Sequence, residues 1–249
     1  MLCIPQLFEK SLLWVVVGIS SALPSKCLAA AEHKAAATQP QLSDRASVSD
    51  FVSWLASVPP MPDSQTPRVW RKNGEVRAID LSSIPVTEQD LELSSRINTL
   101  QEFLASDNKL TYDLRPLARL TKLRDVVLMR CELKPDFFSW VTSDMPLESL
   151  KLNWSRGVNG TLSPLSRLKH LNVLNLSNTD ITNEDIRDLA ECTSLSYLSL
   201  QAANINDSSV EDIARIASLR VLYLGNSDSI SNGGIARLKK LQPDLVLRN

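Results

Sequence analysis

The chain is poor in the residue types on which many enzymatic and metal sites depend. Its 249 residues include two histidines, four cysteines and seven glycines. Neither His33 nor His170 has a neighbouring serine or cysteine with which to form a nucleophile–base pair. The histidines and cysteines also lack the spacing of a zinc site, and no Gly-rich phosphate loop is present. We therefore predict no catalytic residues, no metal and no cofactor.

Strong charge of either sign is also missing. The 27 Lys and Arg are balanced by 28 Asp and Glu, which gives a formal net charge of −1. Basic residues lie scattered among acidic ones, so no basic face for a nucleic-acid partner is indicated. The hydrophobic content of 43% is sufficient for a substantial core.

The first thirty residues have a basic, then an apolar, then a small-residue segment, which is the order found in secretory signal peptides. Lys10 precedes an apolar run over 11–23, and small residues gather over 27–31. This order predicts a signal peptide over 1–30. The run is shorter than the roughly 20 residues of a membrane-spanning helix, so we expect no stable span after cleavage. A secreted, periplasmic or cell-envelope protein is the resulting expectation, and a retained anchor is the alternative.

Residues 31–69 are predicted to form a flexible tether that contains a short helix. Within 47–58, Val48, Phe51, Val52 and Leu55 have the spacing of an amphipathic helix. The proline cluster over 59–62 ends this segment and begins a second linker. We expect the helix either to pack on the repeat domain, predicted over 70–249, or to stay loosely attached.

A block of the form Leu-x-x-Leu-x-Leu recurs along that domain at a step of 24 residues, with one step of 23. The copies begin at Val76, Leu100, Leu123, Leu147, Leu171, Leu195 and Leu219, and Leu245-x-Leu247 forms a truncated eighth copy. Each unit is too small to bury its own apolar face and must stack on its neighbours. The pattern predicts an α/β solenoid of about seven repeats and a partial one, with a parallel sheet on the concave side and helices on the convex side.

The second half of each repeat carries helix-start signals. Thr87, Thr182, Asn206 and Ser231 are suitable N-caps, because a side-chain oxygen there accepts an unpaired backbone N–H. Two repeats differ, since the prolines of Lys134-Pro135 and Ser163-Pro164 favour short or 3₁₀-like connections.

From Val76 to Asn249 the chain resembles leucine-rich repeat proteins, and Leu171–Ile181 and Leu195–Ile205 match their consensus closely. At the position of the asparagine ladder, this sequence has Ile84, Asn108, Cys131, Ser155, Thr179, Ala203 and Ser227. That mixture is similar to the cysteine-containing or bacterial exported subtypes. The resemblance implies a binding surface rather than an active site. Cys131 and Cys192 fall two repeats apart, too far for a disulfide, and are predicted to be buried.

Strand alternation places a mixed set of side chains on the predicted concave face. Tyr197 and Tyr223 fall on adjacent strands, with Lys151 and Asn175 nearby, and these four are our candidate partner-binding residues. The alternative is an ordinary half-exposed strand face, which favours aromatic residues without any ligand. Trp154 follows a strand and precedes an extra turn, and we expect it to anchor that loop; the alternative is that it anchors a partner.

The sequence thus predicts an exported, non-catalytic module that binds a protein partner through its concave face. A structural cell-envelope component that self-associates is the first alternative. An intracellular adaptor of the F-box-associated kind is the second, and it requires that residues 1–30 are not a signal peptide.

Overall fold

The computed structural model describes residues 46–60, 66–225 and 230–248, all of which belong to one compact unit, Leu42–Asn249. The predicted signal peptide and the start of the predicted tether lie outside the described residues. No helix in the described ranges is both long and apolar enough to cross a membrane.

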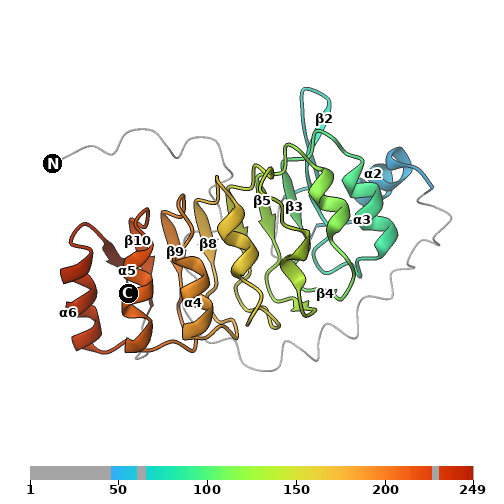
Figure 1. Ribbon diagram of the computed structural model, residues 1–249. Coiled ribbons are helices and arrows are strands. Elements are labelled where there is room, and N and C mark those ends of the chain that lie inside the picture. Colours follow the sequence, from blue (N-terminus) through green and yellow to red (C-terminus); the bar gives the residue numbers. More distant parts are fainter. Residues whose placement is uncertain (1–45, 61–65, 226–229, 249) are drawn as a thin grey trace. The chain divides into compact units, whose positions relative to one another are not determined.

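The elements follow one another in short units of strand and helix (Figure 1). The strands are β1 (Val69–Lys72), β2 (Glu75–Asp80), β3 (Glu102–Leu104), β4 (Lys109–Leu110), β5 (Asp125–Val127), β6 (Glu132–Leu133), β7 (Ser149–Lys151), β8 (Val173–Asn175), β9 (Tyr197–Ser199), β10 (Val221–Tyr223) and β11 (Val246–Arg248). The α-helices are α2 (Val48–Ser57), α3 (Glu88–Ser95), α4 (Asn183–Leu189), α5 (Val210–Arg215) and α6 (Asn232–Leu241). The 3₁₀ helices are η3 (Arg115–Arg119), η4 (Phe137–Trp140), η5 (Ser163–Arg167) and η6 (Asp207–Ser209).

Within the described residues, the main sheet has nine strands in the order β1-β2-β3-β5-β7-β8-β9-β10-β11. From β2 onward the strands are parallel, and their central residues pair in one line: Ile79, Phe103, Val126, Leu150, Leu174, Leu198, Leu222 and Leu247. These are the fourth positions of the predicted repeats, so the predicted register and the solenoid are confirmed. The final copy differs, because Leu247 rather than Leu245 pairs with Leu222.

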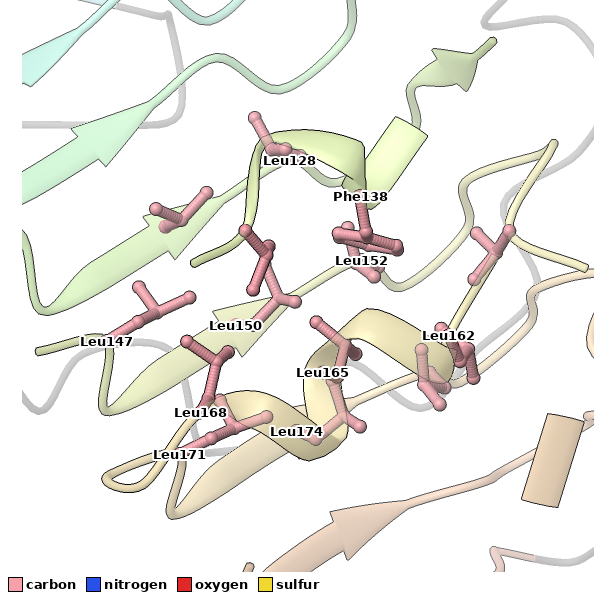
Figure 2. Packing of buried hydrophobic residues seen from close by; sticks show 14 of the residues in the cluster. Leu128, Phe138, Leu147, Leu150, Leu152, Leu162, Leu165, Leu168, Leu171 and Leu174 are labelled. Atoms are coloured by element: carbon pink, nitrogen blue, oxygen red, sulfur yellow. The ribbon is translucent and has the colours of Figure 1, made fainter. Parts of the chain in front are cut away.

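The core fills the space between the sheet and the helical layer. The paired central residues from Ile79 to Leu222 are fully buried, as are leucines of the 3₁₀ segments such as Leu117 and Leu165. Figure 2 shows Leu150 and Leu174 on their strands, with Leu165 of η5 next to Leu174 and Phe138 of η4 next to Leu152. Because each coil contributes only a few such side chains, the core is continuous from coil to coil and depends on the stacking.

The helical segments begin where the capping signals predict. The Thr87 hydroxyl accepts the N–H of Asp90, and the Asp90 carboxylate accepts the N–H of Thr87, which forms a capping box. Asn206 and Ser231 also accept backbone N–H groups at the starts of η6 and α6. The segments that contain Pro135 and Pro164 lead into or form the 3₁₀ helices η4 and η5, as predicted, and η3, which contains Pro116, is a further 3₁₀ helix that the sequence analysis did not predict.

Polar side chains at the ladder position bond from one coil to the coil before it. The Asn108 amide donates to the Leu81 carbonyl, the Cys131 thiol to that of Ala105, and the Ser155 hydroxyl to that of Leu128. These groups satisfy carbonyl oxygens that the turn after each strand leaves without a sheet partner. Thr179 instead bonds within its own coil, to the Leu176 carbonyl.

The N-terminal end of the sheet is covered by two elements. Strand β1 pairs antiparallel with β2 through a two-residue turn at Asn73 and Gly74, which have φ angles of 54° and 81°. Helix α2 buries Phe51, Val52 and Leu55 in the same core as the repeats. The helix over the predicted 47–58 segment is therefore packed onto the solenoid rather than loosely attached.

Candidate functional site

The face of the main sheet turned away from the core is here called the open face. Its side chains alternate along each strand with the buried central residues. The first row consists of Ala78, Glu102, Asp125, Ser149, Val173, Tyr197, Val221 and Val246. The second row consists of Asp80, Leu104, Val127, Lys151, Asn175, Ser199, Tyr223 and Arg248.

The four candidate residues lie together on this face, on successive strands from β7 to β10. Lys151 pairs directly with Asn175, and the second row continues from Asn175 through Ser199 to Tyr223. Tyr197 lies in the first row on β9, diagonal to Tyr223. All four side chains are partly exposed. The predicted grouping is therefore present in the structure, and their part in binding stays a prediction.

Sequence reasoning missed a fifth residue of this group, Arg248. Strand β11 pairs with β10 so that Arg248 lies directly beside Tyr223. Its side chain is exposed. Its position depends on the register of the last copy, in which Leu247 instead of Leu245 pairs with Leu222, two residues from the expected frame.

The pKa of the Tyr197 hydroxyl lies above its ordinary value. Burial raises the pKa of this hydroxyl, and the nearby Tyr223 raises it further, while Ser199 and Arg248 act in the opposite direction. The Asn175 Oδ1 accepts the N–H of Ser177 at 3.0 Å, which leaves its amide nitrogen facing away from that bond. Tyrosine hydroxyls, an amide and a guanidinium therefore make this part of the face rich in hydrogen-bond donors.

Carboxylates occupy the other half of the open face. Glu102 and Asp125 lie side by side in the first row, on β3 and β5. Burial raises the pKa of both, and the charge of Asp125 raises that of Glu102 further, while Lys151 lowers both. Asp80, at the end of β2, lies 3.6 Å from the buried guanidinium of Arg68. The charge on this face thus changes from acidic to basic along the order of the strands.

Trp154 does not anchor the loop that follows β7, contrary to the expectation above. Its side chain is 57% exposed, the largest exposure among the large hydrophobic residues described. Its backbone has a φ of 68°, a left-handed conformation that is unfavourable for a bulky side chain. The chain turns out of the sheet through the same conformation in other repeats, at Asp107, Arg130 and Asn178. The required turn, rather than packing of the indole, therefore fixes the position of Trp154 at the rim of the open face.

The two cysteines of the repeat domain are buried, as predicted. Burial raises the pKa of Cys131 to about 11 and that of Cys192 to about 12. Thiols held protonated in this way are poor nucleophiles and poor metal ligands. No group of three or more His, Cys, Asp or Glu side chains suitable for a metal occurs among the residues that the structure describes.

An open hollow of about 590 Å³ lies on the helical side, at the starts of η3, η4 and η5. Its wall includes an ion pair between Asp113 and Arg115, together with Lys134 and Asp136. The pKa of Asp113 is lowered, chiefly because its carboxylate accepts the backbone N–H of Arg115. Charges of both signs line this hollow, so it does not favour a ligand of either charge.

No known family profile and no curated protein matches this sequence. Among solved structures, internalin C2 from Listeria monocytogenes is 27% identical with a TM-score of 0.53, and the match covers 69% of this chain and 70% of that one. The chain has the leucine-rich repeat fold. Two further similar structures have TM-scores below 0.5. Internalin F from Listeria monocytogenes is 20% identical over 71% of this chain and 58% of its own, with a TM-score of 0.45. The leucine-rich repeat ectodomain of the Arabidopsis thaliana receptor kinase GASSHO1/SCHENGEN3 is 15% identical over 75% and 26%, with a TM-score of 0.48.

Proposed function

We propose that this chain is an exported, non-catalytic leucine-rich repeat module that binds a protein partner through its open face. The observation that carries this proposal is the grouping of Lys151, Asn175, Tyr197 and Tyr223 on adjoining strands. Tyrosines provide a large, rigid contact area together with a hydrogen-bonding group, and they are enriched where binding energy concentrates.

The rigidity of the sheet supports this role. Each of the four residues lies on a strand whose neighbouring position is fully buried, such as Leu150, Leu174 or Leu222. A partner therefore meets side chains whose backbone is fixed before binding, which lowers the entropy cost of association. The scarcity of nucleophile–base pairs in the sequence and the raised pKa values of the buried thiols favour binding over catalysis.

The export part of the proposal is supported by the sequence order of residues 1–30. Its test is N-terminal sequencing of protein recovered from the medium or the periplasm of an expressing cell. Cleavage near residue 30 is the expected result, whereas an intact N-terminus on cytoplasmic protein would contradict export.

The binding part is tested by affinity capture from native extracellular or cell-envelope fractions. The full chain and a Tyr197→Ala/Tyr223→Ala variant serve as baits, and Tyr112→Ala is the matched control because Tyr112 lies outside the open face. We expect a protein that the wild type and the control retain and the double variant loses. Equal retention by all three baits would exclude this site, provided that circular dichroism shows all of them folded.

A self-associating structural component is a second candidate function, because the last coil exposes apolar side chains. Leu241 on α6 is 50% exposed and Val246 on β11 is 46% exposed. Strand β11 also ends the sheet within the described residues, and an edge strand of this kind can pair with another chain. Sedimentation velocity over a hundredfold concentration range tests this function. A constant monomeric sedimentation coefficient would exclude it.

A further inference from the structure

The open face is electrostatically divided, and the division follows the strand order. Toward the N-terminal end, the first row presents Glu102 and Asp125 on adjacent strands. From β8 to β11, the described positions of both rows carry no carboxylate. Arg248, whose side chain is exposed, ends the second row there. A negatively charged ligand group is repelled by the half that carries Glu102 and Asp125 and attracted by the half that carries Arg248. The division therefore selects both the sign and the position of a ligand's charge.

The two rows of the β8–β11 half also differ in polarity. The first row is apolar, with Val173 and Val221 on either side of the Tyr197 ring. The second row presents polar donors, ending with Tyr223 beside Arg248. A ligand that fits both rows places apolar groups along one line and negatively charged or carbonyl groups along the other. An extended polypeptide has this arrangement when its acidic and apolar side chains alternate.

The size of the half limits the length of such a ligand. Three strand-to-strand steps separate β8 from β11, which is about 14 Å at roughly 4.8 Å a step. An extended segment crosses this distance in about four or five residues at roughly 3.3 Å a residue. A short linear segment of a partner therefore suffices. Glu102 on β3 and Asp125 on β5 repel a ligand carboxylate placed toward the N-terminal end of the sheet.

Building on the proposed function, we propose that the partner presents an extended acidic segment to the β8–β11 half of the open face. Its carboxylates contact Arg248 and Tyr223, and its apolar side chains lie against Val173 and Val221. The Tyr197 hydroxyl is protonated at neutral pH, as an ordinary phenol is, and is a further donor on this half.

Selection from an unbiased library of twelve-residue peptides on the purified full chain tests the charge preference. We expect enrichment of aspartate and glutamate interleaved with apolar residues. Enrichment of lysine and arginine, the absence of any charge bias, or the absence of any selected peptide would overturn the acidic-segment proposal. The proposed function is tested independently, by affinity capture: it would be contradicted if no captured partner depended on Tyr197 and Tyr223.

Fluorescence anisotropy of the labelled peptide Glu-Val-Asp-Ser-Glu-Val-Asp-Ser, compared with Lys-Val-Arg-Ser-Lys-Val-Arg-Ser, gives the second readout. The acidic peptide should bind more tightly, lose about tenfold in affinity with Arg248→Gln, and weaken as salt is raised. Lys240→Gln is the matched control, since Lys240 is an exposed cation on α6, outside the open face. An equal loss with both variants would indicate non-specific attraction and overturn the assignment of Arg248, as would tighter binding of the basic peptide.

Discussion

Adjacent residues of β9 have opposite roles in this structure, and substitution of each in turn tests the repeat register. Leu198 is fully buried and pairs with Leu174 and Leu222 on the two flanking strands. Leu198→Ala removes three carbon atoms from a site whose walls are fixed by the sheet, so the cavity cannot collapse. We expect a loss of about 3 to 5 kcal/mol in the free energy of unfolding. Tyr197→Ala removes a partly exposed ring and should cost about 1 kcal/mol or less.

Urea denaturation followed by tryptophan fluorescence and by circular dichroism measures both values. Coincident transitions from the two probes support a two-state treatment. In thermal unfolding, Leu198→Ala should lower Tm by roughly 6 to 20 °C, since 1 kcal/mol corresponds to about 2–4 °C in a chain of this size. Leu222→Ala and Tyr223→Ala form a matched pair on the next strand. If the tyrosine variants lost as much stability as the leucine variants in both pairs, the register would be wrong by one residue.

Three further predictions concern single side chains. Trp154→Asn should leave Tm unchanged or raise it, because asparagine adopts the left-handed conformation more readily; a clear decrease in calorimetry would show that the indole stabilises the fold. Asp180→Ala should cost about 1–3 kcal/mol and speed amide exchange over 157–159, whose three N–H groups the carboxylate accepts; unchanged exchange would contradict this. Glu102→Gln should raise the free energy of unfolding at pH 7, because a carboxyl whose pKa is raised in the folded state opposes folding when it is ionised. Urea denaturation at a series of pH values should show this gain over wild type shrinking toward acid pH; a gain that grows toward acid pH would contradict the raised pKa.

The sheet register was predictable because leucine spacing reports it directly. Burial of the first, fourth and sixth residues of each Leu-x-x-Leu-x-Leu block leaves few alternative frames when neighbouring coils must stack. The β1–β2 hairpin was not predicted, since Val69–Lys72 carries no repeat spacing. Its turn, Asn73-Gly74, is nevertheless a strong two-residue hairpin signal, because both positions require positive φ.

The candidate site was predictable in part. Tyr197 and Tyr223 fall in intact repeats, so their positions followed from the frame. Arg248 was missed because the last copy has a longer spacing, and the pairing of Leu247 with Leu222 sets its place. The exposure of Trp154 was misjudged, since an aromatic residue before a loop packs inward in many proteins. Here the left-handed backbone conformation of the turn directs the indole outward. The residue types around Trp154 do not indicate that conformation.

The parallel pairing of β2 to β11 also determines how the molecule responds to tension. Hydrogen bonds between coils run along the direction in which the coils stack, so a pull on the last strand loads the bonds of one coil before those of the next. Each coil released from the C-terminal end frees 23 to 25 residues, or about 80 Å of extended chain at roughly 3.3 Å a residue. The covered N-terminal end, with α2 and β1 packed on the first coils, should be the last to yield. A partner held near β11 therefore lies on the coils that detach first, so force on the C-terminal end would release it before the rest of the chain unravels.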